Sequence, residues 1–260
     1  MYKYEMHLHS KDVSPCASAD AEQLVAAFTE RGYTGVNLTN HWNPGVLLRR
    51  NLLNMNRYEL ADYYMNGYWK LKEAAGDKLD VLNGMEIAVK GCYNDYLIYN
   101  VTREFLIDLG PDFGYGSIED IIGLAHDHGC MIFHAHPYRH WMMIMPDSLF
   151  RKIGEPFDRN KFDGVESINY GSDDRFSNDM AMDWAEKYNV RTITGSDYHN
   201  KGGKPYGGIL FKEKPDGIEG FMKKLADGDY ALSYFGDMRW KIGEFHPGER
   251  FIEKSRYTEI

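Results

Sequence analysis

Histidines recur in this sequence at a spacing that suits metal binding. His7 and His9 stand two residues apart in an apolar run, and His134 and His136 repeat that spacing in CMIFHAHP. Because side chains alternate between the faces of a β-strand, residues two apart point the same way. Two neutral imidazoles on one face form a pair of metal ligands. Unpaired imidazoles in a buried strand would be costly, so both pairs are candidate ligands.

Two carboxylates and two further histidines add to these pairs. Asp197 stands two residues before His199 in GSDYH, His41 follows Asn40 after an apolar run, and Glu86 ends the run LDVLNGME. A carboxylate has two oxygens and can bridge two cations, which an imidazole cannot do. A site of His, Asp and Glu without paired cysteines suits Zn²⁺, Mn²⁺ or Fe²⁺, and the ligand types leave the choice among these three open.

The apolar pattern predicts the elements that position these ligands. Short strand-like runs alternate with longer helix-like ones, which is typical of parallel βαβ units. Strands are expected at residues 2–8, 35–39, 79–87, 95–101, 130–135, 164–168 and 190–194. Helices are expected at residues 20–31, 57–75, 117–129, 174–188 and 215–225. The candidate ligands fall at or just past the carboxyl ends of several strands, which favours a closed α/β barrel with its site at that end.

Length and composition indicate one ordinary globular domain. The chain has 260 residues, of which 43% are hydrophobic and 27% charged, and this composition excludes disorder and a collagen-like fibre. We expect a single domain over residues 1–260, with an irregular extension at 236–260. The three cysteines (Cys16, Cys92 and Cys130) lie far apart, which excludes a disulfide framework and a cysteine-only zinc site.

Charge and hydropathy bear on location and partners. No apolar run approaches the ~18 residues of a membrane span, and the N-terminus lacks the apolar stretch of a signal peptide. We therefore expect a reducing, cytoplasmic environment. The formal net charge of −9 argues against nucleic acid and anionic membranes as partners and leaves a small phosphorylated substrate in a local basic pocket. The oligomeric state stays open.

The order of these motifs resembles that of the PHP (polymerase and histidinol phosphatase) family. The chain has HxH, then an apolar strand that ends in TNH, then GMEI, HAHPYR and GSDYH. The resemblance extends from about His7 to Gly208, and the combination is far more specific than any one motif. It implies an α/β fold, a distorted (β/α)7 TIM-like barrel that binds up to three divalent metal ions.

The resemblance also implies how the ligands are shared among the metals. The first metal is assigned two histidines and two carboxylates, namely His7, His9, Glu86 and Asp197. Glu86 then bridges to a third metal that His136 also binds, and His41 and His199 hold the second. A catalytic role is assigned to three of these residues: Glu86, Asp197 and His199.

The sequence departs from the family pattern in three places. The usual TDH reads TNH, so an amide, Asn40, replaces a carboxylate. The usual SDG after the first motif is missing, and Asp12 and Cys16 are the two candidates for its ligand role. Asp95 stands where a histidine often faces the third metal. The resemblance therefore leaves the number of bound metals at two or three.

The predicted function is metal-dependent hydrolysis of a small phosphomonoester, similar to that of histidinol phosphatases. Clustered divalent ions activate water and clamp the reacting oxygens, and GxSxG, P-loop and GxGxxG motifs are absent. Candidate phosphate-binding residues are Arg139, His140, Lys201 and Lys204. The alternative is a degenerate PHP module that binds metal for a structural or regulatory role. The identity of the phosphomonoester cannot be read from the sequence.

Overall fold

Strands of this protein pair into a single curved sheet in the computed structural model, which describes residues 1–89, 95–113, 116–138, 161–171 and 175–234. The sheet order is β10-β9-β1-β2-β4-β5-β6-β7-β8, with β3 paired to β4. The strands are β1 (Tyr2–Leu8), β2 (Gly35–Leu38), β3 (His41–Trp42), β4 (Asp80–Ala88), β5 (Asp95–Tyr99), β6 (Met131–His134), β7 (Gly164–Asn169), β8 (Thr192–Gly195), β9 (Ile209–Phe211) and β10 (Ala231–Leu232).

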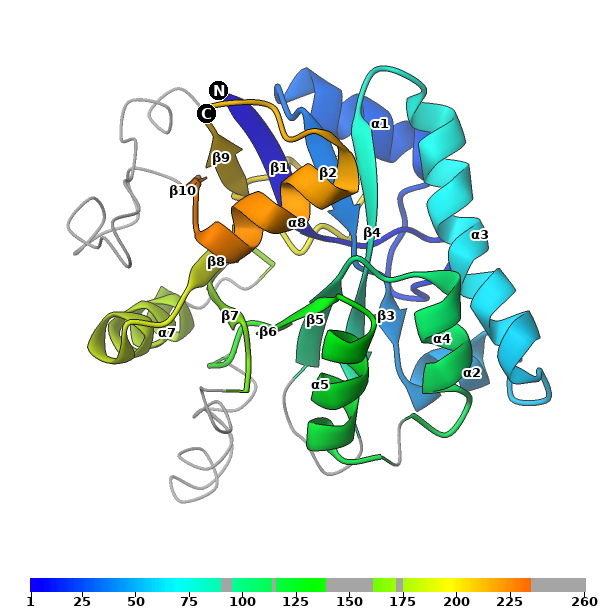
Figure 1. Cartoon of the computed structure of the whole chain (residues 1–260). Coiled ribbons are helices and arrows are strands. Elements are labelled where there is room, and N and C mark those ends of the chain that lie inside the picture. Colours follow the sequence, from blue (N-terminus) through cyan, green and yellow to red (C-terminus); the bar gives the residue numbers. More distant parts are fainter. Residues whose placement is uncertain (90–94, 114–115, 139–160, 172–174, 235–260) are drawn as a thin grey trace.

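Helices surround this sheet on the outside, as Figure 1 shows. They are α1 (Ala21–Glu30), α2 (Pro44–Arg49), α3 (Arg57–Ala75), α4 (Arg103–Leu109), α5 (Ile118–Asp127), α7 (Arg175–Tyr188) and α8 (Gly217–Asp227). The sequence at their starts explains where two of them begin, because Ser117 and Asp120 form a capping box at α5, and Asp20 and Gln23 form another at α1. Among the described helices, none combines the length and apolar character that a bilayer crossing needs.

The sheet closes on itself where β8 meets β1. Leu8 bridges Tyr198 in parallel, and the amide of His9 donates to the carbonyl of Tyr198 at 3.1 Å. The ring β1-β2-β4-β5-β6-β7-β8 is therefore a nearly closed α/β barrel, and the predicted fold class, a distorted TIM-like barrel, is confirmed. The single domain over 1–260 stays a prediction, because residues 235–260 lie outside the described residues.

The expectation of uniformly parallel strands is wrong at β5. This strand runs antiparallel to both β4 and β6. Only residues 89–94 connect Ala88 at the end of β4 to Asp95 at the start of β5. A parallel crossover needs a dozen or more residues. A connection this short therefore forces the chain to reverse its direction. β9 is also antiparallel to β1.

We expect opposite stability effects from alanine at two glycines. A Cβ on Gly35 would lie 2.3 Å from the Tyr4 ring and 2.9 Å from the Asp80 carbonyl, so Gly35→Ala should lower the free energy of unfolding by about 1–3 kcal/mol. Gly123 lies within α5 with open space around it, so Gly123→Ala should raise that free energy by about 0.5–1 kcal/mol. Denaturant unfolding measures both, and a neutral Gly35→Ala would contradict the close packing of β1, β2 and β4.

Candidate metal centre

Seven polar side chains converge at the carboxyl ends of the barrel strands. Two come from β1 and the residue after it, one from β3, one from β4, one from just past β6 and two from just past β8. They are His7, His9, His41, Glu86, His136, Asp197 and His199. Five of them are buried, and the side chains of His41 and His199 are 18% and 21% exposed. The cluster therefore faces solvent through the His41 and His199 side.

The ligand atoms of these residues form three overlapping groups within metal-binding reach. Within each group the candidate atoms lie within 4.8 Å of one another. The groups are His7, His9 and Asp197; His7, Glu86 and His136; and His9, His41 and His199. Three groups agree in number with the sites that the family resemblance implies. The assignment of each residue to a particular metal stays a prediction.

Glu86 lies at the centre of the cluster, with two imidazoles at each of its oxygens. Its Oε1 lies 2.9 Å from His136 Nε2 and 3.4 Å from His7 Nε2. Its Oε2 lies 2.6 Å from His41 Nδ1 and 3.4 Å from His9 Nε2. Each oxygen therefore faces a different group of histidines, which is the arrangement that a carboxylate bridging two cations requires.

Burial and neighbouring charges shift the proton affinities of this cluster in opposite directions. Burial lowers the pKa of His7, but the carboxylates of Asp197 and Glu166 outweigh it and hold the pKa well above its usual value. Burial and the nearby His41 hold the pKa of His9 well below its usual value. Burial raises the pKa of Glu86, but His41 and His7 pull it well below the usual range. A cation that binds His7 Nε2 would displace the proton from that atom.

The donor set fits divalent cations. The Nε2 atom of His7 is fully buried and makes no hydrogen bond among the described residues, although Asp197 Oδ1 and Glu86 Oε1 each lie 3.4 Å away. A buried nitrogen without a partner costs free energy unless a ligand occupies the space in front of it. Imidazole and carboxylate donors directed at one point suit Zn²⁺, Mn²⁺ or Fe²⁺.

Two of the candidate ligands stand on strained backbone. His136 has φ +23° and Asp197 has φ +48°, in the left-handed region that residues other than glycine rarely adopt. Such conformations cost free energy and persist where the surrounding structure holds them. His136 stands two residues after the end of β6, and Asp197 stands two residues after the end of β8. The chain therefore turns sharply at the site and directs these side chains into the cluster.

The expectation that His134 pairs with His136 on one face is wrong. His134 ends β6 and packs against Tyr96 and Phe162, with ring centroids 5.3 and 6.0 Å away. Burial lowers its pKa to about 3. The two-residue spacing fails here because β6 ends at His134 and the positive φ of His136 redirects the chain.

Two predicted ligands, Asp12 and Asp95, are not in any of the three groups found among the described residues. The carboxylate of Asp12 instead pairs with Lys70 Nζ at 2.7 Å. Asp95 is half-buried at the start of β5. Cys16, the other candidate for the missing SDG, is also outside the three groups, although its contacts with His199 and His41 outweigh burial and lower its thiol pKa to about 6. The choice between Asp12 and Cys16 therefore stays a prediction.

Asn40, which replaces the family's carboxylate, supports His9 through Ser14. Asn40 Oδ1 accepts from Ser14 Oγ at 2.9 Å and from the Ser10 amide at 2.8 Å. Because the one hydroxyl proton of Ser14 is donated to Asn40, Ser14 Oγ can only accept from His9 Nδ1, 3.4 Å away. This chain supports the Nδ1 side of His9, while its Nε2 lies 3.1 Å from Asp197 Oδ1 and 3.4 Å from Glu86 Oε2.

The predicted phosphate-binding residues divide into two pairs. Lys201 and Lys204 line a cavity of about 750 Å³, together with Arg31 and Tyr198. Ser18 Oγ accepts from the Lys201 amide at 3.0 Å and lies 3.4 Å from the His199 carbonyl, which ties this loop to the cluster. The other pair, Arg139 and His140, lies outside the described residues.

Sequence reasoning missed a second layer of buried polar groups behind the ligands. Glu166 in β7 accepts from His7 Nδ1 and from the His136 amide, and Glu5 in β1 accepts from the amides of His7 and Ser196. Burial raises the pKa of Glu5 to about 7, despite these amide hydrogen bonds. The only signal was a charged residue inside each apolar run, YKYEMHL and GVESIN, which requires a buried partner.

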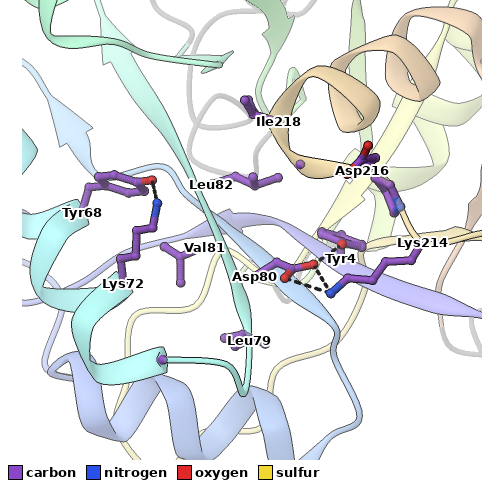
Figure 2. A pocket seen from close by; sticks show the side chains of 13 residues that line it. Tyr4, Tyr68, Lys72, Leu79, Asp80, Val81, Leu82, Lys214, Asp216 and Ile218 are labelled. Carbon is purple, nitrogen blue, oxygen red and sulfur yellow. Dashed lines mark hydrogen bonds and ion pairs between the residues drawn. The ribbon is translucent and has the colours of Figure 1, made fainter.

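A different cavity lies at the opposite ends of the strands. It has a volume of about 470 Å³, and Figure 2 shows Tyr4, Lys72, Asp80 and Lys214 around it. Asp80 accepts from Tyr4 Oη at 2.5 Å and pairs with Lys214 at 3.0 Å. It begins β4, six residues before Glu86, which is about 20 Å along a strand. This cavity therefore does not adjoin the metal centre.

Solved structures share this fold at low sequence identity. A two-domain protein from Bacteroides vulgatus, with a predicted PHP-like metal-dependent phosphoesterase, aligns at TM-score 0.65 and 17% identity over 90% of this chain and 65% of its own. Endonuclease Q from Pyrococcus furiosus aligns at TM-score 0.51 and 16% identity over 89% of this chain and 57% of its own. This chain thus spans less than two thirds of either protein. No family model and no curated protein sequence matches it.

A third similar structure is a metal-dependent phosphoesterase by its description, from Bifidobacterium adolescentis. It aligns at TM-score 0.51 and 13% identity over 85% of this chain and 95% of its own. This chain has the PHP-type fold. The neighbours differ in what they act on, so the likeness establishes the architecture alone.

The expectation that excluded nucleic acid is contradicted by one of these neighbours. A structure of endonuclease Q, at TM-score 0.51 and 16% identity, contains a 27-mer duplex with an abasic lesion at the active site. A PHP-type fold therefore accommodates DNA in that protein. The net charge of −9 describes the whole surface, whereas a metal centre and a few local cations decide what a site of this kind accepts.

In the metal-free protein, we expect Cys16 to be alkylated by iodoacetamide at a rate that is near its maximum by pH 7. Burial opposes ionisation, but hydrogen bonds to His199 and His41 outweigh it and lower the thiol pKa to about 6, so the reactive thiolate dominates at pH 7. Burial raises the pKa of Cys130 to about 12, so that thiol should stay unreactive. Mass spectrometry of peptides across pH 5 to 9 gives the rate at each cysteine.

Cys16→Ser supplies the control, since it should lose this labelled peptide. Excess Zn²⁺ should slow the alkylation if Cys16 lies against a bound ion. A rate that keeps rising in proportion to hydroxide above pH 7 would contradict the contact between Cys16 and the two histidines.

Proposed function

We propose that this protein is a metal-dependent phosphoesterase that hydrolyses a small phosphomonoester. The observation that carries the proposal is the convergence of five histidines and two carboxylates at the carboxyl end of a PHP-type barrel. Two or three bound ions of Zn, Mn or Fe would supply Lewis acidity toward the phosphate and activate the attacking water.

The residues of the chain would then bind the ions and orient the substrate. His7, His9, Glu86 and Asp197 would hold one ion, Glu86 with His136 another, and His41 with His199 a further one. Glu86 and Asp197 would offset the positive charge of the ions inside a buried site. His41 and His199 are the partly exposed members, so the ester would approach from their side.

Two groups would receive the phosphate and its substituent. The loop with Lys201 and Lys204 follows His199 directly and is tied to it through Ser18. Its cavity of about 750 Å³ has room for a small organic group. Arg139 and His140 stay proposed phosphate ligands from the sequence.

The test is phosphate release from a panel of phosphomonoesters by the metal-loaded chain, with Mn²⁺ or Zn²⁺ added. Wild type should turn over at least one ester, and a His7→Ala, His9→Ala double variant should be at least about 100-fold slower, because even second-layer losses cost 10–100-fold in metal sites. Elemental analysis gives the metal content of both proteins. Full metal occupancy without turnover of any ester would favour the degenerate metal-binding module, and absence of bound metal would overturn both hypotheses.

A second candidate is cleavage of a phosphodiester in nucleic acid. It is favoured by the likeness to endonuclease Q and by the cations Arg31, Lys201 and Lys204 around one cavity. These three cations would bind phosphates that flank the scissile one.

This candidate is tested with labelled duplex and single-stranded DNA, with and without an abasic site. Cleavage should weaken steeply with added salt, and Lys201→Ala, Lys204→Ala should reduce both the rate and the salt dependence. Lys223→Ala, on exposed α8, is the matched control and should change neither. Turnover of monoesters with no DNA cleavage at low salt would reject this candidate.

A further inference from the structure

Glu166 joins two candidate metal ligands from behind the cluster. Its Oε1 lies 3.0 Å from His7 Nδ1, and its Oε2 accepts from the His136 amide at 3.0 Å. Asn169 Nδ2 donates to the same Oε2 at 3.0 Å. The side chains of Glu166 and His7 are both fully buried. Both carboxylate oxygens are therefore committed to groups that position ligands.

The hydrogen bond to Glu166 determines which nitrogen of His7 carries a proton. A carboxylate in this position accepts only, so His7 Nδ1 must donate to it. The Nε2 atom is then left for the cluster, and it is the buried nitrogen without a hydrogen-bond partner among the described residues. It faces Glu86 and Asp197, each 3.4 Å away. The direction of His7 thus follows from a residue on another strand.

The neighbouring backbone leaves room for this contact. A Cβ on Gly195 in β8 would lie 2.5 Å from His7 Cβ and 2.6 Å from Glu166 Oε1. Any larger residue there would wedge His7 and Glu166 apart. The same carboxylate holds the amide of His136, whose φ of +23° is strained. One side chain thus secures both an imidazole tautomer and a strained turn.

We propose that Glu166 is a positioning residue of the metal centre, which fixes His7 with Nε2 toward the cation and holds the turn that presents His136. The inference rests on the proposed function only in that it assumes a bound divalent ion. A carboxylate behind a ligating histidine raises its basicity and fixes its ring. The residue would touch neither substrate nor metal.

Glu166→Gln tests the proposal with Zn²⁺ or Mn²⁺ alone, titrated against a competing chelator. Glutamine has one acceptor and one donor, so it cannot accept from both His7 and His136. We expect the affinity for the ion to fall 10- to 100-fold. Glu119→Gln, at a half-exposed position on α5, is the matched control and should leave the affinity unchanged. An unchanged affinity in Glu166→Gln would overturn the proposal.

A double-mutant cycle separates positioning from a general effect on the fold. In a His7→Ala background, Glu166→Gln should weaken binding by a smaller factor than it does in wild type, because the contact with His7 is gone and only the contact with the His136 amide is left. An equal loss in both backgrounds would overturn a role through His7. Gly195→Ala should mimic Glu166→Gln, with a loss of tenfold or more.

A spectroscopic measurement on the wild-type protein remains decisive if these variants fail to fold. In the Zn²⁺-loaded chain, ¹⁵N spectra should show His7 protonated at Nδ1 and bound through Nε2. Binding through Nδ1 would overturn the proposal. Because metal affinity and tautomer are measured without substrate, a protein that binds metal but releases no phosphate would reject the proposed function and leave this inference standing.

Discussion

The buried carboxylate of Glu86 is the constraint on which the rest of the site depends. An ionised group without exposure to water is tolerated only when opposite charges or hydrogen bonds surround it, and here the compensation comes from His7, His9, His41 and His136. Those imidazoles arrive from three other parts of the barrel. The strands must therefore keep their register, and the bridge between Leu8 and Tyr198 must bring Asp197 beside β1. The imidazoles that offset the charge of Glu86 are also the groups among which cations would bind.

Residue type and spacing were enough to find the ligands that stand on regular strands. His7 and His9 do share a face of β1, and Glu86 and His41 meet because β3 pairs with β4 in the register His41 opposite Glu86. The pattern failed where the backbone leaves the strand, as at His134 and His136. It also could not find Glu166, since a lone glutamate in an apolar run has no spacing partner and its role appears only once β7 lies beside β6 and β8. The reversal at β5 was readable in principle from the six-residue connection.

The departures from the PHP pattern differ in how much they change the site. At Asn40, the contacts to Oδ1 come from donors, namely the Ser10 amide, the Ser10 hydroxyl and the Ser14 hydroxyl, so an amide oxygen serves as well as a carboxylate oxygen. The change from TDH to TNH therefore removes a charge but keeps the hydrogen-bond chain that orients His9. The missing SDG aspartate changes the chemistry of the available ligands. A thiol, Cys16, lies near His41 and His199, and if it bound an ion in place of the aspartate, this softer ligand would favour Zn²⁺ or Fe²⁺ over Mn²⁺.

The choice between a monoester and a diester depends on the exposed side of the centre. Among the candidate ligands, His41 and His199 are partly exposed and Lys201 follows His199 by two residues in the chain, whereas the side chains of His7, Glu86 and Glu166 are fully buried. These buried residues would fix the geometry of the ions and would contribute nothing to the selection of the substituent on phosphorus. Under the proposed function, we infer that selection would involve the loop after His199, where Lys201 and Lys204 line a cavity together with Glu30, Arg31 and Tyr198. Cations there would favour further phosphates, so substitutions in that loop should change which ester is hydrolysed while leaving metal affinity intact.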